Sequence, residues 1–388
     1  MTVLLGEGSD GLQTQPDAAA NPTLQLLSSI SRRLDRLRQL MAARDIAALW
    51  VCQEENRRYL SGFTGDSGQL IITATARYLL TDGRFTEQAG QEAPDFTIVD
   101  TGSKPWEQLG ATLNAAGVTR LHFEAEHLSY AAYEEFYAQA AKWPRSVELV
   151  PARGLVEGLR QIKDAYELQL LQQAIDLADT GFNHLLQVVH PGITERDIAL
   201  ELEYFLGRQG SRGPSFTTII AGGPRAALPH GVADERVLQP GDLVVMDFGA
   251  VYGGYHSDLT RTVALAPAAP EWRQLYHIVR EAQEQAISTI RAGITGREVD
   301  AVAREHIAAA GYGPYFNHSL GHGVGLAVHE SPSLSSRSEV ELSAGMVATV
   351  EPGVYLPGRG GIRIEDVVLV QEGGARVLSH APRDFIEL

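Results

Sequence analysis

PGDLVVMDFG at residues 240–249 returns later in the chain in altered form, as AGMVATVEPG at residues 344–353. In both stretches a turn dipeptide is followed by an apolar run of the length of a buried strand. Each run ends in a carboxylate, Asp247 in the first and Glu351 in the second. The sequence therefore predicts two strands of similar environment, each presenting an acid at its end.

A second pair of segments precedes these strands in the same order. PGIT at residues 191–194 and AGIT at residues 292–295 each open a helical pattern, and the two patterns end in the same register at Gly210 and Gly311. One such match would be weak, but four features that agree in order indicate a duplication. We expect two related half-domains that face each other, with a site between them.

Each half also contains a hairpin that carries two acids. Asp247 and Asp258 are equally far from the turn at residues 252–254, and Glu351 and Glu365 are equally far from Gly358. Antiparallel pairing would set each pair directly opposite, with Cβ atoms about 5 Å apart. Because facing carboxylates repel each other, four of them need compensating positive charge, which two divalent metal ions would supply.

His322 is the natural fifth ligand, since the glycines of GHGVG at residues 321–325 leave its side chain accessible. His318 lies four residues earlier, a spacing that would suit two ligands on one helix, but the glycines argue against a helix there. An oxygen-rich set favours manganese-like ions, and the single imidazole also admits cobalt, zinc or iron. We expect two divalent metal ions and favour Mn²⁺ as their identity.

The N-terminal half shows a different pattern, in which short apolar runs alternate with helical stretches. An apolar stripe from Leu27 to Met41 predicts the first helix, and a long helix is expected over residues 162–189. The division we expect is a flexible extension over residues 1–23, an α/β domain over 24–153 and a catalytic domain over 154–388. The predicted strands of the α/β domain cover residues 46–51, 70–73, 78–80, 97–99 and 121–123.

Composition narrows the class of protein. The chain has 388 residues, 44% of them hydrophobic and 21% charged, with a net charge of −16. No stretch approaches the roughly 20 apolar residues of a membrane span, and the acidic surface disfavours nucleic acid and anionic lipid. Cys52 has no second cysteine to pair with, which fits a reducing, cytoplasmic location. These features favour a cytoplasmic enzyme with no membrane or nucleic-acid partner.

Taken singly, Asp247 or Glu351 could be an ordinary turn or salt-bridge residue, but the set of acids as a whole is hard to explain in that way. Some histidines also stand out by their setting. His230, His318, His322 and His329 occupy or flank turns rich in glycine and proline, where functional groups are commonly displayed.

At these residues the sequence resembles the pita-bread metallopeptidase family, which includes methionine aminopeptidase, prolidase and aminopeptidase P. The resemblance runs from about Arg32 to the C-terminus. It rests on the motifs MDFGA, SDLTRT, HSLGHGVG, VHES, VEPGVY and GIRIED. The fold that it implies is an α/β N-terminal domain followed by an α+β pita-bread domain with an internal pseudo-two-fold duplication. The family's metal ligands correspond to Asp247, Asp258, His322, Glu351 and Glu365.

The resemblance also implies roles for these and neighbouring residues. Asp247 and Glu365 are expected to bridge the two ions, which activate a bridging water. Glu351 looks like the general base, in addition to being a ligand. The matches to the family's substrate-orienting and charge-stabilising groups are His230, His318, His329, Tyr355 and Arg363. For Arg363 a structural salt bridge to a ligand carboxylate is an equally good interpretation.

Within the family, RYLSGFTG at residues 58–65 and TDGRF at residues 81–85 are most similar to aminopeptidase P. The first hypothesis is therefore an Xaa-Pro aminopeptidase that acts on short peptides with proline second, and the alternative is an Xaa-Pro dipeptidase. The same resemblance implies a homodimer, in which the Asp82 and Arg84 region could reach the site of a neighbouring subunit. The proline preference itself comes only from the resemblance.

A hypothesis from another class is a binding module for peptides or histones, because some pita-bread domains have lost their metal ligands. The net charge of −16 would suit basic partners. All five ligand positions are nevertheless occupied by metal-binding residues here. The ligand set therefore favours an enzyme.

Overall fold

The structure is a computed structural model that describes residues 21–388. An N-terminal domain is built on one six-stranded sheet with the strand order β4-β3-β2-β1-β5-β6. The strands β1, β2 and β3 are antiparallel neighbours, whereas the pairs β3/β4, β1/β5 and β5/β6 are parallel. Its elements are α1 (Pro22–Ala43), β1 (Ala48–Val51), α2 (Glu54–Ser61), β2 (Gln69–Thr73), β3 (Arg77–Thr81), α3 (Thr86–Glu92), β4 (Thr97–Asp100), α4 (Pro105–Ala115), β5 (Arg120–Glu124), α5 (Tyr130–Ala140) and β6 (Glu148–Ala152).

The first helix confirms the predicted apolar stripe, because α1 buries Ile30, Leu34, Leu37 and Met41. It begins earlier than expected. Asn21 caps it by accepting hydrogen bonds from the backbone of the next turn, so residues 22 and 23 of the expected extension are helical. The rest of that extension, residues 1–20, lies outside the described residues.

All five predicted strands of this domain are present as β1 to β5. A sixth strand, β6, was not predicted from the sequence. This strand contains Pro151, and Leu149 is its one buried residue. It lies at the edge of the sheet and pairs only with β5, which is where a proline is tolerated. In the sequence, Pro151 opens the stretch PARG at residues 151–154, which marks a break in the chain and hides the strand.

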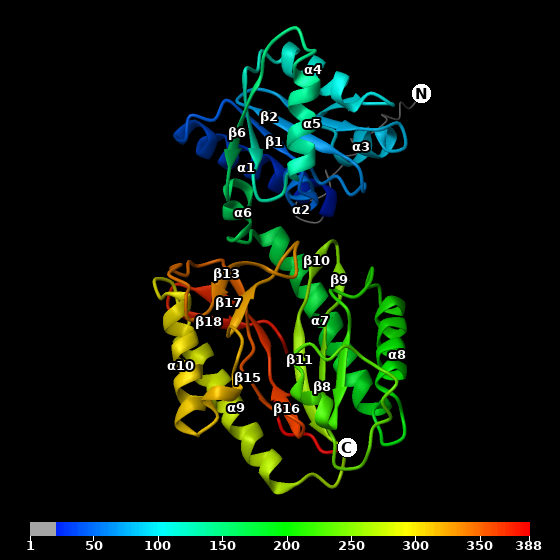
Figure 1. Cartoon of the computed structure of the whole chain (residues 1–388), viewed down its shortest axis with the longest axis vertical. Helices are drawn as coiled ribbons and strands as arrows, with labels where there is room; N and C mark the ends of the chain where they lie inside the picture. The colour runs from blue at the N-terminus through cyan, green and yellow to red at the C-terminus, as the bar shows by residue number, and fades with distance from the viewer. Residues whose placement is uncertain (1–20) are drawn as a thin grey trace, which may run out of the picture.

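Two helices lead from the N-terminal domain into the catalytic domain: the short α6 (Leu155–Arg160), which was not predicted, and the long α7 (Ala165–Val188), which confirms the helix expected over residues 162–189. Asp164 and Glu167 form a capping box at the start of α7, and this local signal fixes where the helix begins. Figure 1 shows α6 and α7 joining the N-terminal domain to the catalytic domain below it.

The remaining elements form two halves that lie side by side in Figure 1, the first in green and the second in yellow to red. The first half contains α8 (Glu195–Arg208), β7 (Ile219–Gly222), η2 (Gly223–Ala227), β8 (Leu243–Phe248), β9 (Val251–Tyr252), β10 (Tyr255–His256) and β11 (Leu259–Ala264). The second half contains α9 (Pro270–Thr289), α10 (Gly296–Ala309), η3 (Gly313–Tyr315), β12 (Gly321–Gly323), β13 (Glu330–Leu334), β14 (Val347–Val350), β15 (Gly353–Leu356), β16 (Gly360–Arg363), β17 (Asp366–Gln371) and β18 (Gly374–Val377).

The expected duplication is present down to single hydrogen bonds. Thr194 caps α8 and Thr295 caps α10 through the same side-chain bond to the third helical residue. The backbone of the preceding loop is also repeated, since the Gly192 N–H donates to the Leu238 carbonyl at 2.9 Å and the Gly293 N–H donates to the Leu342 carbonyl at 2.8 Å. The fold class predicted from the sequence, an α/β domain followed by a duplicated pita-bread domain, is confirmed.

Between the two halves lie the sheets that carry the acids. One sheet has the order β11-β8-β7 and the other β13-β12-β14-β17-β18, with the ribbon β15-β16 beside them. The apolar residues of β8 and of β14 are fully buried. Among residues 21–388, none of the helices combines the length and the apolar character that a membrane span needs.

We expect the replacement of Thr295 by alanine to lower the free energy of unfolding by about 1 kcal/mol, because an N-terminal cap and its capping box are lost. Thr295→Ser keeps the hydroxyl and should remain close to wild type. Urea denaturation of both variants measures the difference. Equal stability of the two variants would show that this cap contributes nothing.

Candidate metal centre

A cavity of about 430 Å³ opens where the two halves of the catalytic domain meet. Both halves contribute to its wall, as the duplication predicts. The lining residues are Phe216, Thr217, Ile219, Pro229, His230, Val232, Asp247, Asp258, His318, Ser319, His322, His329, Glu351, Arg363 and Glu365. The structure therefore brings together all five candidate metal ligands, the three other histidines and Arg363.

The first acid pair comes from β8 and the segment before β11, and its register differs from the expectation. Asp247 pairs with Thr260, and the turn is centred on Gly253 and Gly254, so Asp258 is not directly opposite Asp247. Both glycines have positive φ, which fixes a tight two-residue turn at this position. Because Asp258 is two residues from Thr260, it still lies on the face of the hairpin that Asp247 occupies.

The second acid pair has the expected register. Gly353 pairs with Arg363 and Val350 pairs with Asp366, and the positions between them place Glu351 opposite Glu365. The turn around Gly358 is the midpoint that the sequence indicated. The local hairpin thus sets these two carboxylates face to face.

The two hairpins converge on one small volume. Carboxylate oxygens of Asp247, Asp258 and Glu365 all lie within 4.8 Å of one another, and these three residues are buried. Asp247 Oδ1 and Glu365 Oε1 have no hydrogen-bond partner among the described residues. Burying a carboxylate oxygen without a partner costs free energy, and such oxygens coordinate divalent cations.

Burial and mutual repulsion determine the protonation of this cluster. Burial raises the pKa of Asp258 and of Glu365 well above the ordinary carboxyl range, and the negative charges of the neighbouring acids add to the effect. Burial also raises the pKa of Asp247, although the Arg363 guanidinium opposes this shift. A carboxyl cluster of this kind becomes fully ionised only when positive charge is bound beside it.

Glu351 and His322 form the other part of the centre. His322 Nε2 lies 3.3 Å from Glu351 Oε1 and 3.6 Å from Asp258 Oδ2. Burial alone would raise the pKa of Glu351, but the hydrogen bond and charge of His322 lower it to about 2. His322 Nδ1 lies 3.0 Å from the Gly323 carbonyl, which accepts its Nδ1–H. Although burial opposes the charged ring, the hydrogen bond to Glu351 raises the pKa of His322, so Nε2–H points at the carboxylates in the metal-free protein. Loss of that proton would leave Nε2 free for a metal ion.

Arg363 makes the salt bridge that the sequence left as one of two interpretations. Its Nη2 is 2.5 Å from Asp247 Oδ2, while Nη1 donates to Tyr355 Oη at 2.6 Å and to the Pro229 carbonyl at 3.1 Å. The side chain is buried and also lines the cavity. It therefore supplies one fixed positive charge to four carboxylates.

The three other histidines surround the centre from different segments. The His318 Nδ1 atom lies 2.7 Å from the Ser319 carbonyl, which leaves Nε2 to accept the hydrogen bond of the Tyr355 hydroxyl at 2.9 Å. Burial lowers the pKa of His318, in keeping with a neutral ring. The His329 ring is 4.3 Å from the His322 ring, and His230 is exposed at the mouth.

Asp82 and Arg84 are outside this site. They pair with each other at 2.8 Å on the surface of the N-terminal domain and do not line the cavity of their own chain. Thr260 was not identified from the sequence, although it lies in the SDLTRT motif. Its hydroxyl donates to Glu365 Oε2 at 2.7 Å and accepts from Arg363 Nε at 3.1 Å, so it connects the two hairpins.

Two related half-domains that hold a cluster of acids and one histidine between them define the pita-bread class of metallohydrolases. The sequence profile of metallopeptidase family M24 matches residues 169–372, and the creatinase/prolidase N-terminal domain matches residues 33–162. The chain belongs to metallopeptidase family M24, and it is a peptidase whose chemistry uses divalent metal.

Relatives of known name cover nearly the whole chain. The Xaa-Pro dipeptidase of Pyrococcus furiosus is 36% identical over 92% of this chain and 100% of its own length. The solved structure of an Xaa-Pro dipeptidase from Bacillus anthracis is 40% identical, covers 92% of this chain and 100% of its own, and has a TM-score of 0.89. The structure of an X-Pro aminopeptidase from Thermotoga maritima is 37% identical, covers 92% and 99%, and has a TM-score of 0.85.

The raised pKa values predict how the metal-free protein responds to pH. Asp258 and Glu365 are protonated in the folded metal-free state at pH values where they are ionised in the unfolded chain. The stability that these two residues contribute to the folded state is fully present below the ordinary carboxyl pKa. It is lost as the pH rises through their raised pKa values. The melting temperature of chelator-treated protein should therefore fall as the pH is raised above about 4.5.

Saturating divalent metal should reduce this loss, because ion binding displaces the shared protons. Calorimetric scans of the same preparation with chelator and with Mn²⁺ across the pH series provide the comparison. If the two series have parallel pH dependences, the acid cluster is not the metal centre.

Proposed function

We propose that this peptidase hydrolyses the bond between an N-terminal residue and a following proline, and that its preferred substrates are Xaa-Pro dipeptides. The observation that carries the proposal is the similarity of 36% to 40% identity, over 92% of the chain, to proteins named Xaa-Pro dipeptidase. The N-terminal motifs alone favoured the aminopeptidase, and the relatives favour the dipeptidase.

In this proposal the chain holds two divalent ions through Asp247, Asp258, His322, Glu351 and Glu365. Buried carboxylate oxygens without partners support the assignment, as does the His322 Nε2 atom that lies 3.3 Å from Glu351 and 3.6 Å from Asp258. When bound, the ions lower the pKa of water and polarise the scissile carbonyl. Four carboxylates and one imidazole favour Mn²⁺ among the divalent metals.

The side chains around the ions have distinct tasks in this mechanism. Glu351 lines the cavity beside the other acids, so in its ionised form it is placed to accept the proton of the attacking water. It then delivers a proton to the proline nitrogen, which carries no hydrogen in the peptide and must leave as a secondary amine. Arg363 remains paired with Asp247 and keeps that carboxylate ionised.

His230, His318 and His329 come from three separate segments and present imidazoles toward the space where a substrate would lie. We assign all three to orienting the substrate, and His230 and His329 also to stabilising the charge that develops on the scissile carbonyl oxygen, because both ring nitrogens of His318 are engaged by Ser319 and Tyr355. The chain of hydrogen bonds from Arg363 through Tyr355 fixes the tautomer of His318. The apolar wall of Phe216, Pro229 and Val232 is suited to a pyrrolidine ring.

A neighbouring cavity supports the dipeptidase over the aminopeptidase. It has about 390 Å³ and shares His318 and Ser319 with the metal cavity. Of its two arginines, Arg304 is paired with Asp300, whereas Arg337 is exposed and forms no ion pair among the described residues. A cation beside the cavity provides a partner for the free carboxylate of a dipeptide.

The second candidate remains an Xaa-Pro aminopeptidase, which releases the first residue from longer peptides. The specific observation in its favour is the 37% identity to the Thermotoga maritima structure of that name. Homodimer formation, which the family resemblance implied, is a further part of the proposal.

Substrate length decides between the two candidates. With Mn²⁺ present, kcat/KM should be highest for Ala-Pro, lower for Ala-Pro-Ala and lowest for Ala-Ala. In the proposal, the carboxylate of Ala-Pro lies beside the neighbouring cavity that Arg337 lines, a longer peptide carries its carboxylate further along the chain, and Ala-Ala lacks the proline ring. The measurement is the initial rate of alanine release from each peptide at matched metal loading. A preference for Ala-Pro-Ala would establish the aminopeptidase instead, and a preference for Ala-Ala would remove proline specificity.

His329 offers a test of the residues that are not ligands. Its replacement by alanine should lower kcat by about 100-fold, since one group that stabilises developing charge is lost, while the metal content stays near two ions per chain. The matched control is His277→Ala, which removes an exposed imidazole from α9. Steady-state kinetics and elemental analysis are needed for both variants. Wild-type kcat in His329→Ala would take His329 out of the mechanism.

A further inference from the structure

Glu330 directly follows His329 in the chain and is the centre of a buried ion triplet. Its Oε2 is 2.5 Å from Arg160 Nη2 and its Oε1 is 2.5 Å from Lys163 Nζ. The side chains of Arg160 and Lys163 are 4% and 1% exposed, and that of Glu330 is 11% exposed. Although burial opposes ionisation, these two cations lower the pKa of Glu330, so the carboxylate is charged at neutral pH.

The triplet organises the backbone that leads to His329. The Gly325 N–H donates to the Ala327 carbonyl at 3.0 Å, and the Gly325 carbonyl accepts from the His256 N–H at 2.8 Å. A Cβ atom at Gly325 would lie 2.4 Å from Glu330 Oε1, so the turn is folded directly against this carboxylate. The segment from residue 325 to residue 330 is therefore closed around the triplet.

A line of hydrogen bonds connects the same triplet to the N-terminal domain. Arg160 Nη1 donates to Asn56 Oδ1 at 2.9 Å, and Asn56 Nδ2 donates to Glu124 Oε1 at 2.7 Å. Glu124 lies at the end of β5, and its other oxygen accepts from the backbone N–H groups of Cys52 and Gln53, both at 2.7 Å.

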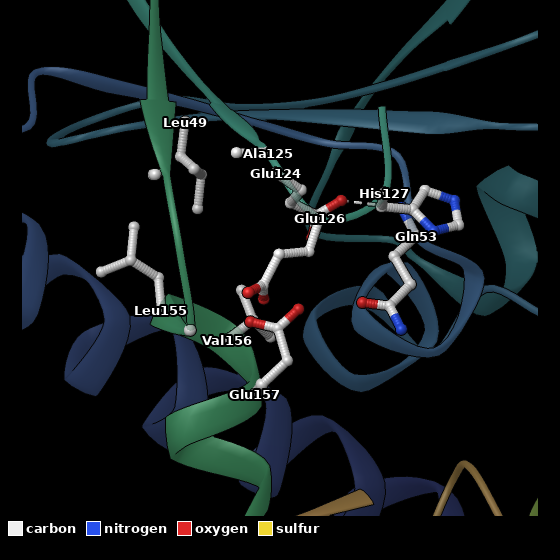
Figure 2. A pocket seen from close by; sticks show the side chains of 11 residues that line it. Leu49, Gln53, Glu124, Ala125, Glu126, His127, Leu155, Val156 and Glu157 are labelled. Carbon is white, nitrogen blue, oxygen red and sulfur yellow. Dashed lines mark hydrogen bonds between the residues drawn. The ribbon is translucent and has the colours of Figure 1, made fainter. Parts of the chain in front are cut away.

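Figure 2 shows the N-terminal end of this line. Glu124 and Gln53 of the N-terminal domain and Glu157 of α6 lie around one cavity at the junction of the domains. Glu157 Oε1 accepts a hydrogen bond from Asn56 Nδ2 at 2.6 Å. Asn56 is fully buried, and its hydrogen bonds run from Glu124 of the sheet to Glu157 and Arg160 of α6, the helix that leads to the catalytic domain.

Stability alone is a weak reason for such an arrangement. Three charged groups lose their hydration when they are buried, and apolar residues of the same volume often give equal or greater stability. What an ion triplet with paired hydrogen bonds does provide is one defined geometry, because its donors and acceptor fit in only one arrangement. The feature that requires such geometry here is the adjacent imidazole of His329 at the metal cavity.

We propose that the Arg160–Glu330–Lys163 triplet positions the His329 side chain in the cavity. Through Asn56, the position of His329 then depends on the docking of the N-terminal domain. The inference rests on the proposed function, because it takes His329 to contact the substrate. Glu330, Arg160 and Lys163 act through His329 and do not touch the reacting groups.

The test compares Glu330→Gln, Arg160→Met and Asn56→Leu in the full-length, Mn²⁺-loaded protein. Arg160→Met leaves one cation and one carboxylate, so it keeps the buried charge balanced if Glu330→Gln fails to fold. We expect kcat per metal-loaded molecule to fall about 10- to 100-fold in the two triplet variants, with KM changed little, since misplacement of His329 affects the transition state. Asn56→Leu should give a smaller fall in the same parameter.

A second readout does not depend on activity. Hydrogen exchange of the peptide covering residues 324–334 should become faster in all three variants, while peptides of α9 remain as in the wild type. The matched control is Asp242→Asn, which removes a carboxylate paired with Arg236 at 2.7 Å in the same domain, away from the cavity. It should lower the melting temperature without changing kcat or the exchange of residues 324–334.

The outcomes separate this inference from the proposed function. If the wild type cleaves no Xaa-Pro peptide, the proposed function fails, and the exchange data still report whether the triplet orders the segment. Wild-type kcat and exchange in Glu330→Gln and Arg160→Met would overturn the positioning role. Wild-type values in Asn56→Leu alone would overturn its dependence on the N-terminal domain.

Discussion

Four carboxylates that share one buried volume are the constraint on which the rest of this structure depends. Burial disfavours their ionised forms, and each charge further disfavours its neighbours. Arg363 compensates only part of this charge, because its guanidinium is committed to Asp247, Tyr355 and Pro229. The remaining negative charge is what makes the cavity a site for divalent ions, and a peptidase of family M24 uses such ions.

The duplication brings the four acids together. Each hairpin carries two of them, so the chain needs to align only two rigid ribbons. Thr260 connects the ribbons by bonding both Glu365 and Arg363. Behind them Arg261 pairs with Asp366 at 2.8 Å, fully buried, and also donates to the Glu365 carbonyl. The cluster is thus held from behind by fixed bonds, and the cavity side is left for metal and substrate.

The N-terminal domain meets the catalytic domain through charged groups as well as through a shared apolar core. Arg58 donates to the Gly253 carbonyl at 2.8 Å, at the turn of the hairpin that carries Asp247 and Asp258. On the other side of the junction, Arg160 reaches Glu330 beside His329. Both contacts end on segments that lead to the metal cavity. The N-terminal domain and its linker thus contact segments of the site within one chain, whereas Asp82 and Arg84 lie elsewhere on the surface of that domain.

The sequence by itself determined what is local. Turn residues set the register that places Glu351 opposite Glu365, and the repeated segments at 191–194 and 292–295 and at 240–249 and 344–353 indicated the duplication. Even local reasoning missed the register of Asp258 by two residues, because Gly253 and Gly254 move the centre of the turn. The sequence left a salt bridge from Arg363 to a ligand carboxylate as one of two interpretations, but the choice of Asp247 as its partner and the pairing of Arg160 with Glu330 were decided only by the tertiary structure. These partners are 116 and 170 residues apart, and a long-range ion pair has no periodicity or spacing along the chain from which to predict it.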